Sequence, residues 1–222
     1  MSKVAFLGLG VMGFPIAGHL KSRGGHDVVV YNRTAATAEK WVDRFGGASA
    51  PTPRAAASGC DIVFACVGND SDVRAVTLGE EGAFGGMRRD AVFVDHTTAS
   101  ANVARELAIE ARRRKLGFVD APVSGGQAGA ESGQLTVMCG GESEDYARVE
   151  PAISAYARSC CLMGPSGAGQ LTKMVNQICI AGLVQALSEG LRFAKAAGLD
   201  QQLVVDVISK GCLLYTSDAA DE

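Results

Sequence analysis

The residues of this chain that could do chemistry together lie in separate segments. Lys173 stands near the start of an Ala/Leu-rich helical run, directly after the glycine-rich turn Gly164–Gly169 (G-P-S-G-A-G). Ser124-Gly125-Gly126 is a polar loop in the middle of the chain, and Gly8–Gly13 (G-L-G-V-M-G) follows the first apolar stretch. A nucleotide-binding loop, a loop suited to a small anion and a lysine on a helix together indicate hydride transfer to or from a small carbonyl compound.

The loop Gly8–Gly13 has the G-x-G-x-x-G spacing of dinucleotide-binding loops and lies between an expected strand and an expected helix. The first glycine permits a tight turn, the second lets a diphosphate approach the backbone, and the third lets the helix pack closely on the strand. The diphosphate would lie at the helix N-terminus, where free N–H groups and the helix dipole favour negative charge. We expect the following residues to bind the dinucleotide: Gly8, Leu9, Gly10, Val11, Met12 and Gly13.

Cofactor choice depends on the end of the second expected strand, which reads Tyr31-Asn32-Arg33-Thr34. An acidic residue there would bind the ribose 2′-hydroxyl of NAD. The guanidinium of Arg33 can instead pair with two oxygens of a 2′-phosphate. We therefore expect Asn32, Arg33 and Thr34 to bind the cofactor, and NADP(H) to be preferred. The alternative, in which Arg33 is a solvated turn residue, leaves NAD(H) open.

Strand-like and helical segments alternate over the first part of the chain. This alternation predicts an α/β, Rossmann-type, doubly wound and mainly parallel sheet that is covered on both faces by helices. The expected strands are 4–7, 28–31, 62–67, 91–94, 117–119 and 135–139, and the expected helices are 11–23, 35–45, 71–78, 101–115 and 142–156.

The pattern changes near Gly164-Pro165, because no strand interrupts the helical run 168–197, and a second helix is expected over 201–209. We place a domain boundary there. Residues 1–164 would form an NADP-binding Rossmann domain, and residues 165–211 the start of a truncated, all-helical domain. Residues 212–222 lack a capping pattern and an amphipathic face, which favours a non-native tail over a frayed natural one.

Composition excludes several classes of function. A length of 222 residues, an apolar fraction of 47%, a charged fraction of 20% and a net charge of -3 are typical of a globular protein without a basic footprint for nucleic acid. No apolar run reaches the roughly 18 residues of a membrane helix, and the N-terminus does not resemble a signal peptide, so we expect a cytoplasmic protein.

The seven cysteines contain no C-x-x-C pair and are expected to be reduced thiols, mostly in the core. The adjacent Cys160 and Cys161 are expected to be buried at a strand end, with a redox-active pair as the alternative. We expect no metal site.

In order along the chain, four segments resemble the β-hydroxyacid dehydrogenases, the family that includes 3-hydroxyisobutyrate dehydrogenase and 2-hydroxy-3-oxopropionate (tartronate semialdehyde) reductase. They are Gly8–Gly13 with Pro15, Asp120–Gly126 (D-A-P-V-S-G-G), Leu135–Gly141, and G-x-G-x-x-x-K over 167–173. The resemblance covers residues 1 to about 211.

The resemblance implies a role for each matching position. Ser124, Gly125 and Gly126 would hold the substrate carboxylate. Thr98 would contact the nicotinamide end of the cofactor, and Val67 and Gly68 would line the same cleft. Asn176 and Gln177 would face the substrate, with the choice between them open. The family pattern gives His96 no chemical role, so we interpret it as structural.

Lys173 matches the catalytic lysine of that family. A lysine with an ordinary pKa of about 10.4 is a poor base at neutral pH, so the role requires burial or a nearby helix N-terminus to lower its pKa.

The implied function is that of an NADP(H)-dependent oxidoreductase of small β-hydroxy acids or semialdehydes, acting on CH–OH groups. The partner would be a small carboxylate substrate, not nucleic acid or a membrane, and the full-length parent would be a homo-oligomer. Relatives continue with further helices, so the alternative is a truncated, inactive dinucleotide-binding fragment. A scaffold that uses the fold only to bind a partner is a third reading.

Overall fold

The computed structural model of the chain describes residues 2–211, which form two compact units divided between Met174 and Val175. The domain boundary expected at residue 164 stays a prediction. The non-native tail predicted for 212–222 lies outside the described residues.

Within the described residues, the first unit contains a nine-stranded sheet in the order β3-β2-β1-β4-β5-β6-β8-β7, with β9 paired to β8. Strands β1 to β6 are parallel, β8 is antiparallel to β6 and β7, and β9 is parallel to β8. The chain runs outward from β1 to β3 and then returns to the other side of β1 at β4, which confirms the doubly wound Rossmann-type fold. The strands are β1 Lys3–Leu7, β2 Asp27–Tyr31, β3 Ala48–Ser49, β4 Ile62–Ala65, β5 Val92–Asp95, β6 Gly117–Asp120, β7 Val123–Ser124, β8 Leu135–Gly141 and β9 Ala157–Gly164.

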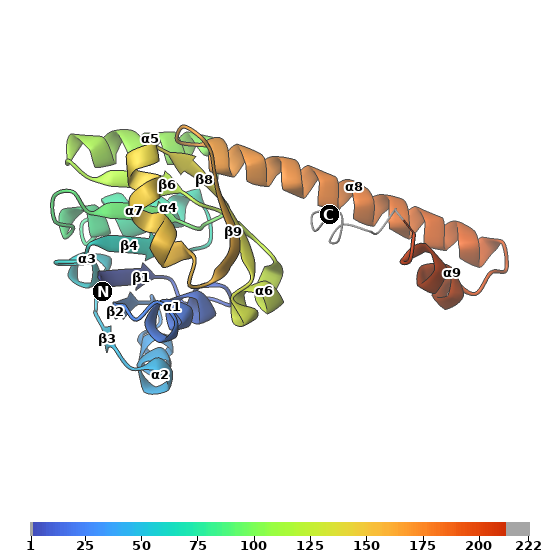
Figure 1. Cartoon of the computed structure of the whole chain (residues 1–222), viewed down its shortest axis with the longest axis horizontal. Coiled ribbons are helices and arrows are strands. Elements are labelled where there is room, and N and C mark those ends of the chain that lie inside the picture. The colour runs from blue at the N-terminus through green and yellow to red at the C-terminus, as the bar shows by residue number, and fades with distance from the viewer. Residues whose placement is uncertain (1, 212–222) are drawn as a thin grey trace. The chain divides into compact units, whose positions relative to one another are not determined.

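Helices cover both faces of this sheet (Figure 1). One face packs against α1 (Gly13–Ser22), α2 (Ala35–Phe45) and α7 (Ser143–Ile153). The other face packs against α3 (Pro53–Ala57), α4 (Asp70–Leu78) and α5 (Ala101–Arg113). A 3₁₀ turn at Ala83–Gly85 and the short helix α6 (Gly126–Ser132) complete the unit.

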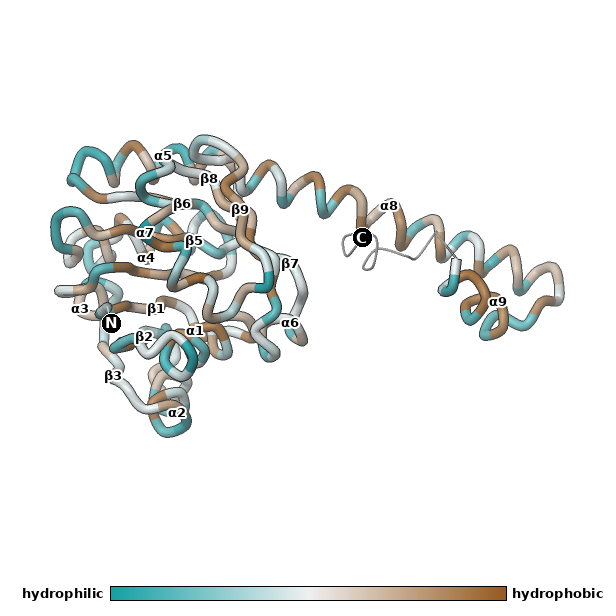
Figure 2. The backbone as a smooth tube through the Cα atoms, viewed as in Figure 1, coloured by the Kyte–Doolittle hydropathy of each residue, from teal (hydrophilic) through white to brown (hydrophobic). Residues whose placement is uncertain are grey.

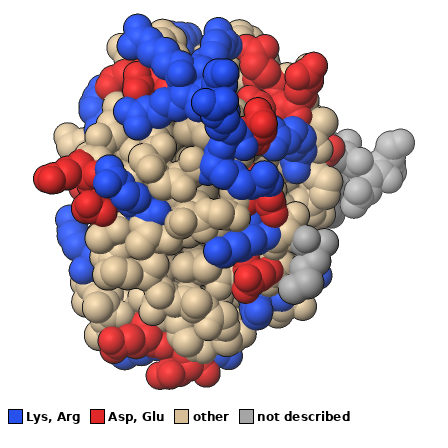
Figure 3. Space-filling model, turned by 90° about the vertical axis from the view of Figure 1, so that its left-hand side faces the viewer, with Lys and Arg blue, Asp and Glu red and all other residues tan. Residues whose placement is uncertain are grey.

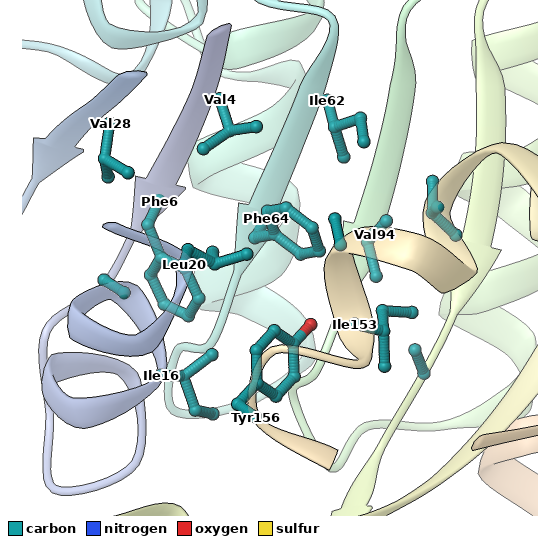
Figure 4. Close-up of a cluster of buried hydrophobic side chains, with 14 of the residues drawn as sticks. Val4, Phe6, Ile16, Leu20, Val28, Ile62, Phe64, Val94, Ile153 and Tyr156 are labelled. Carbon is teal, nitrogen blue, oxygen red and sulfur yellow. The ribbon is translucent and has the colours of Figure 1, made fainter. Parts of the chain in front are cut away.

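The core follows from the two-residue period of the central strands. In β1, Val4 and Phe6 point to one face, and Ala5 and Leu7 to the other, and all of them are fully buried. Figure 4 shows the first of these clusters, in which Phe6 and Phe64 stack with their ring centroids 6.1 Å apart. Full burial of such a side chain stabilises the fold by about 1.5–3 kcal/mol.

Charged side chains of both signs share the surface of the face seen in Figure 3, with the basic ones gathered toward its upper edge. The arginines at the end of α5 are ion-paired: Arg112 with Glu142 at 2.9 Å, and Arg114 with Glu110 at 2.7 Å. These exposed pairs contribute little to stability, because water and salt screen them.

The second unit consists of most of α8 (Ala168–Ala196) together with α9 (Gln201–Ile208). Apolar residues recur along α8 (Figure 2), yet Ala194 is the single buried residue of the described range 175–211. Gly198, with φ of +75°, lies in the turn after α8, and the Asp200 side chain caps α9 by accepting hydrogen bonds from the N–H groups of Gln202 and Leu203.

The structure adds elements that the sequence pattern did not predict, namely β3, α3, β7, α6 and the whole of β9. The expectation that Cys160 and Cys161 are buried is wrong. Both lie within β9, where Cys160 is half-buried and Cys161 is exposed, because one face of this strand is open. In the described part of the chain, no helix combines the length and apolarity needed to cross a bilayer.

Candidate functional site

A cavity of about 630 Å³ lies at the carboxyl ends of β1, β2 and β4. Its walls include the glycine loop, the end of β2 and the turn after β4. The structure thus brings together all the predicted cofactor residues except two: Leu9 is buried at 4% exposure, Thr98 is exposed, and neither lines the cavity. Those that do are Gly8, Gly10, Val11, Met12, Gly13, Asn32, Arg33, Thr34, Val67 and Gly68.

The three glycines of the loop have different geometric reasons to lack a side chain. A Cβ on Gly8, whose φ is +93°, would lie 2.3 Å from the Cys66 carbonyl oxygen, and one on Gly13 would lie 2.0 Å from that of Gly8. A Cβ on Gly10 would meet nothing within 4 Å. The first and third glycines therefore permit close packing, and the second leaves open space beside the cavity.

The start of α1 suits an anion. Its first turn carries no acidic residue, and in the described chain no side chain caps Met12 at its N-terminus. The positive end of the helix dipole therefore has no compensating side chain at the glycine loop. The diphosphate of a dinucleotide fits this arrangement.

Asn32 has a structural role that sequence reasoning missed. Its Oδ1 accepts a hydrogen bond from the N–H of Leu9 at 2.9 Å, and its Nδ2 donates to the carbonyl of Thr34 at 3.1 Å. The Asn32 amide therefore fixes the glycine loop against the end of β2. Arg33 and Thr34 are exposed and line the cavity beside it.

Lys173 lies in the second turn of α8, within the first unit, and is 9% exposed. Burial lowers the pKa of its ammonium group below the ordinary value. Within residues 2–211, the structure gives that ammonium neither a hydrogen-bond nor an ion-pair partner. The Nζ atom itself is not fully buried, and a partly desolvated amine with a lowered pKa and no fixed partner is typical of functional sites.

The buried carboxylate of Asp120, at the end of β6, holds the start of α8. Its Oδ1 accepts from the N–H of Gly167 at 2.7 Å, and its Oδ2 from the N–H of Gln170 at 3.0 Å. Burial raises the pKa of Asp120, and these hydrogen bonds oppose that rise. A Cβ on Gly169 would lie 2.4 Å from the Met138 carbonyl oxygen, so the first turn packs directly on the backbone of the sheet.

Gln170, one turn before Lys173, joins α8 to the loop that follows β5. Its Nε2 donates to the Thr97 carbonyl at 2.7 Å, and its Oε1 accepts from the N–H of Ala99 at 3.0 Å. The Oγ1 of the same Thr97 accepts from the N–H of Val67, a cavity residue, at 3.0 Å. A continuous set of hydrogen bonds thus runs from the cavity to the helix that carries Lys173. The sequence analysis did not single out Gln170.

The predicted carboxylate loop follows β7 and opens α6. Ser124 is half-buried, whereas Gly125 and Gly126 are exposed and have positive φ values of +126° and +60°. The other end of α6 is tied to α1: the Nε2 of His19 lies 3.1 Å from the Ala130 carbonyl oxygen, and Arg23 donates to that of Ser132 at 3.0 Å. The loop is therefore attached to the helix that begins at the glycine loop.

Asn176 and Gln177 belong to the second unit. Asn176 is half-buried and Gln177 exposed, and the Nδ2 of Asn176 donates to the Oε1 of Gln177 at 3.2 Å. Their role toward the substrate stays a prediction.

Two buried titratable groups lie at the end of β5 and beyond it. The Nδ1 of His96 is 2.6 Å from the Ala121 carbonyl oxygen, its Nε2 is 2.8 Å from the Tyr156 hydroxyl, and burial lowers its pKa to about 4. This neutral, fully bonded imidazole is part of the core. The Oδ1 of Asp95 accepts from the N–H of Thr97, whereas its buried Oδ2 has no partner among the described residues, and burial raises its pKa to about 7.

Family models match both parts of the chain. Residues 3–164 match the NAD-binding domain of 6-phosphogluconate dehydrogenase, and residues 167–214 match the NAD-binding domain of NADP-dependent 3-hydroxyisobutyrate dehydrogenase. The chain is 64% identical to an uncharacterized oxidoreductase of Shewanella frigidimarina over 95% of its length and 72% of that protein. It is 34% identical to the 2-hydroxy-3-oxopropionate reductase of Escherichia coli, over 94% of this chain and 70% of the relative.

A solved structure resembles the chain as a whole. The 3-hydroxyisobutyrate dehydrogenase of Mycobacterium tuberculosis, solved with L-serine, has a TM-score of 0.87 and 30% sequence identity, with 97% of this chain and 74% of that one covered. The matched segments include the glycine loop, the Asp120 loop and the start of α8. The chain belongs to the β-hydroxyacid dehydrogenase family of NAD(P)-binding oxidoreductases.

Proposed function

We propose that this chain forms the cofactor-binding and proton-transfer part of an NADP(H)-dependent oxidoreductase that acts on small β-hydroxy acids or the matching semialdehydes. The observation that carries the proposal is the largely buried Lys173 side chain, which has no described partner. It stands on a helix whose start is bound to Asp120 and, through Gln170 and Thr97, to the cavity residue Val67. The names of two relatives, a 2-hydroxy-3-oxopropionate reductase and a 3-hydroxyisobutyrate dehydrogenase, point to the same class of substrate.

Each group has a defined part in the reaction. A nicotinamide cofactor, when bound, supplies or accepts the hydride. The glycine loop and the start of α1 hold its diphosphate, and Ser124, Gly125 and Gly126 hold the substrate carboxylate. Lys173 gives a proton to the carbonyl oxygen during reduction, or takes one from the hydroxyl during oxidation. Its lowered pKa suits both directions, because a proton on an ordinary lysine leaves too rarely at neutral pH.

Replacement of Lys173 tests the proton-transfer role. We expect Lys173→Ala to lower kcat by about 10²–10⁴-fold, the range of general acid–base groups, with little change in the affinity for NADPH. Turnover of 2-hydroxy-3-oxopropionate and 3-hydroxyisobutyrate is measured by nicotinamide absorbance, and NADPH affinity by fluorescence titration. The exposed Lys195, replaced by Ala, is the matched control on the same helix.

These assays also distinguish an active oxidoreductase from an inactive dinucleotide-binding fragment. Retained turnover in Lys173→Ala contradicts the catalytic role. NADPH binding without turnover of either substrate by the wild-type chain favours the inactive dinucleotide-binding fragment.

Arg33 carries the proposed preference for NADP(H). A hydrogen bond to a charged group contributes about 1.5–3 kcal/mol, so Arg33→Ala should weaken NADPH binding about tenfold or more. NADH lacks the 2′-phosphate, and its affinity should change little. The control is Lys40→Ala, another exposed cation, on α2. Equal losses for the two cofactors would contradict the preference.

A further inference from the structure

Two thiols that play no part in the proposed reaction lie side by side in the sheet. The Sγ atoms of Cys139 on β8 and Cys160 on β9 are 3.5 Å apart. The strands are parallel, and in their register Cys160 is opposite Val137 while Cys139 is opposite Leu162. The two cysteines are therefore diagonal neighbours on one face of the sheet, the face that joins the core around α7.

The two thiols differ in burial and in acidity. Cys139 is fully buried, and its pKa is raised, first by the hydrogen bond that its thiol shares with Cys160 and then by burial. Cys160 is half-buried, and the same hydrogen bond lowers its pKa. Either thiol can donate this hydrogen bond, and the opposite pKa shifts favour Cys160 as the sulfur that more readily becomes a thiolate. Cys160 is also the less buried residue of the two. The thiolate is the form of cysteine that attacks oxidants.

We propose that Cys139 and Cys160 form a dithiol site that hydroperoxides oxidise to a reversible intramolecular disulfide. In the first step the Cys160 thiolate attacks one peroxide oxygen. An S–O bond forms, the O–O bond breaks, and hydroxide leaves and takes up a proton to become water. In the second step Cys139 loses its proton and attacks the Cys160 sulfur, the S–O bond breaks, and a second water leaves. Two thiols are oxidised, and one hydrogen peroxide is reduced to two waters.

Cys161 is not the partner in this reaction, although it is adjacent in sequence. Successive side chains of a strand point to opposite faces, so Cys161 points away from Cys139 and is exposed on the other side of β9. The sequence alternative of a redox-active Cys160–Cys161 pair is thereby replaced by a pair across two strands.

A disulfide at this place would be reducible. The sulfurs must approach from 3.5 Å to about 2.0 Å, and diagonal neighbours on paired strands are not held in the geometry of a relaxed disulfide. Strained disulfides have higher reduction potentials and are reduced more easily than structural ones. We expect dithiothreitol to restore both thiols at concentrations that leave the fold intact.

Mass spectrometry of the full chain tests the proposal. After treatment with hydrogen peroxide, the wild-type chain should lose the mass of two hydrogen atoms, and peptide mapping should link Cys139 to Cys160. The Cys161→Ser variant should form the same link. The Cys139→Ser variant should instead retain a sulfenic acid on Cys160, which dimedone traps.

A second probe works without oxidation. Phenylarsine oxide joins two neighbouring thiols through one arsenic atom, so it should add once to the wild-type chain and to Cys161→Ser, and bind Cys139→Ser at least tenfold more weakly. Circular dichroism of each variant verifies its fold. Links that involve Cys161, Cys179 or Cys212, links between chains, or unchanged Cys139 and Cys160 after peroxide would each overturn the proposal.

Discussion

The two compact units bury their apolar residues to very different extents. In the first unit, the central strands place successive residues in two separate cores, and Phe6, Phe64 and Phe93 are all fully buried. In the described part of the second unit, Ile178, Phe193 and Val207 are 71%, 73% and 70% exposed. Both units have regular helices, so the difference does not arise from secondary structure.

This contrast shows that helix formation and a core are separate requirements. The α9 helix has an N-cap, and α8 is long, but most helical stability in proteins comes from packing of an apolar face. The first unit provides that packing with its own residues. The second unit, within 175–211, does not, and this stretch matches relatives that are longer than this chain.

The largest expected effect is the difference in the free energy of unfolding between two Phe→Ala variants, one in each unit. Phe64→Ala leaves a cavity in the core and should lower the free energy of unfolding by about 3–5 kcal/mol. Phe193→Ala removes an exposed ring and should change it by less than about 0.5 kcal/mol. Urea unfolding followed by circular dichroism measures both. Similar losses for the two variants would mean that the second unit has a core of its own.

The next largest effect is the difference in stability loss between two Asp→Ala variants. Each of the two aspartates accepts hydrogen bonds from helix N–H groups. Asp120 is buried, so Asp120→Ala leaves the N–H groups of Gly167 and Gln170 unsatisfied, which costs about 1–3 kcal/mol for each. Asp200 caps α9 at an exposed position, where water replaces the lost acceptor, so Asp200→Ala should cost less. Hydrogen exchange at Gly167 and Gln170 should accelerate only in the first variant. Equal destabilisation by the two variants would contradict the contrast in burial.

The smallest effect is a dependence of stability on pH that belongs to the first unit. The pKa of Asp95 is raised to about 7 in the folded state, above the ordinary value of about 4. The folded state therefore binds a proton more tightly, and this contribution is fully present below about pH 4 and is lost as the pH rises toward 7. Asp95→Asn should remove it, so the variant should gain stability relative to the wild type between pH 5 and pH 8.

Urea unfolding at several pH values measures this difference, with the exposed Asp27→Asn as control. A difference between wild type and Asp95→Asn that stays constant with pH would rule out the raised pKa.

Much of the first unit could be predicted from local pattern. The glycine spacing from Gly8 to Gly13 identifies a strand, a tight turn and a helix together, because each glycine has its own geometric role. The alternation of apolar strands with helical segments was sufficient for the doubly wound topology. The long helix that begins at Ala168 was also predictable, since no strand pattern interrupts it.

What escaped prediction depends on contacts between distant residues. The strand β9 mixes Arg158 and Ser159 with cysteines, because one of its faces is open, and so it lacks an apolar pattern. The side-chain partners of Asn32 and Gln170 are backbone groups of loops, which have no sequence signature. Asp120 is a partial exception. It lies in the segment D-A-P-V-S-G-G that resembles the family, but the sequence analysis assigned the aspartate no role.

The Asn32 side chain forms hydrogen bonds with both the glycine loop and the N-cap residue of α2, which limits how cofactor choice can be altered by mutation. An acidic residue at the end of β2 favours NAD. In Asn32→Asp, however, one carboxylate oxygen would lie against the Thr34 carbonyl oxygen, which now accepts a hydrogen bond from the Asn32 amide. This substitution would bring two hydrogen-bond acceptors together and so weaken the attachment of the glycine loop to the end of β2. Mutagenesis that aims to alter cofactor choice should therefore begin at Arg33 and leave Asn32 unchanged.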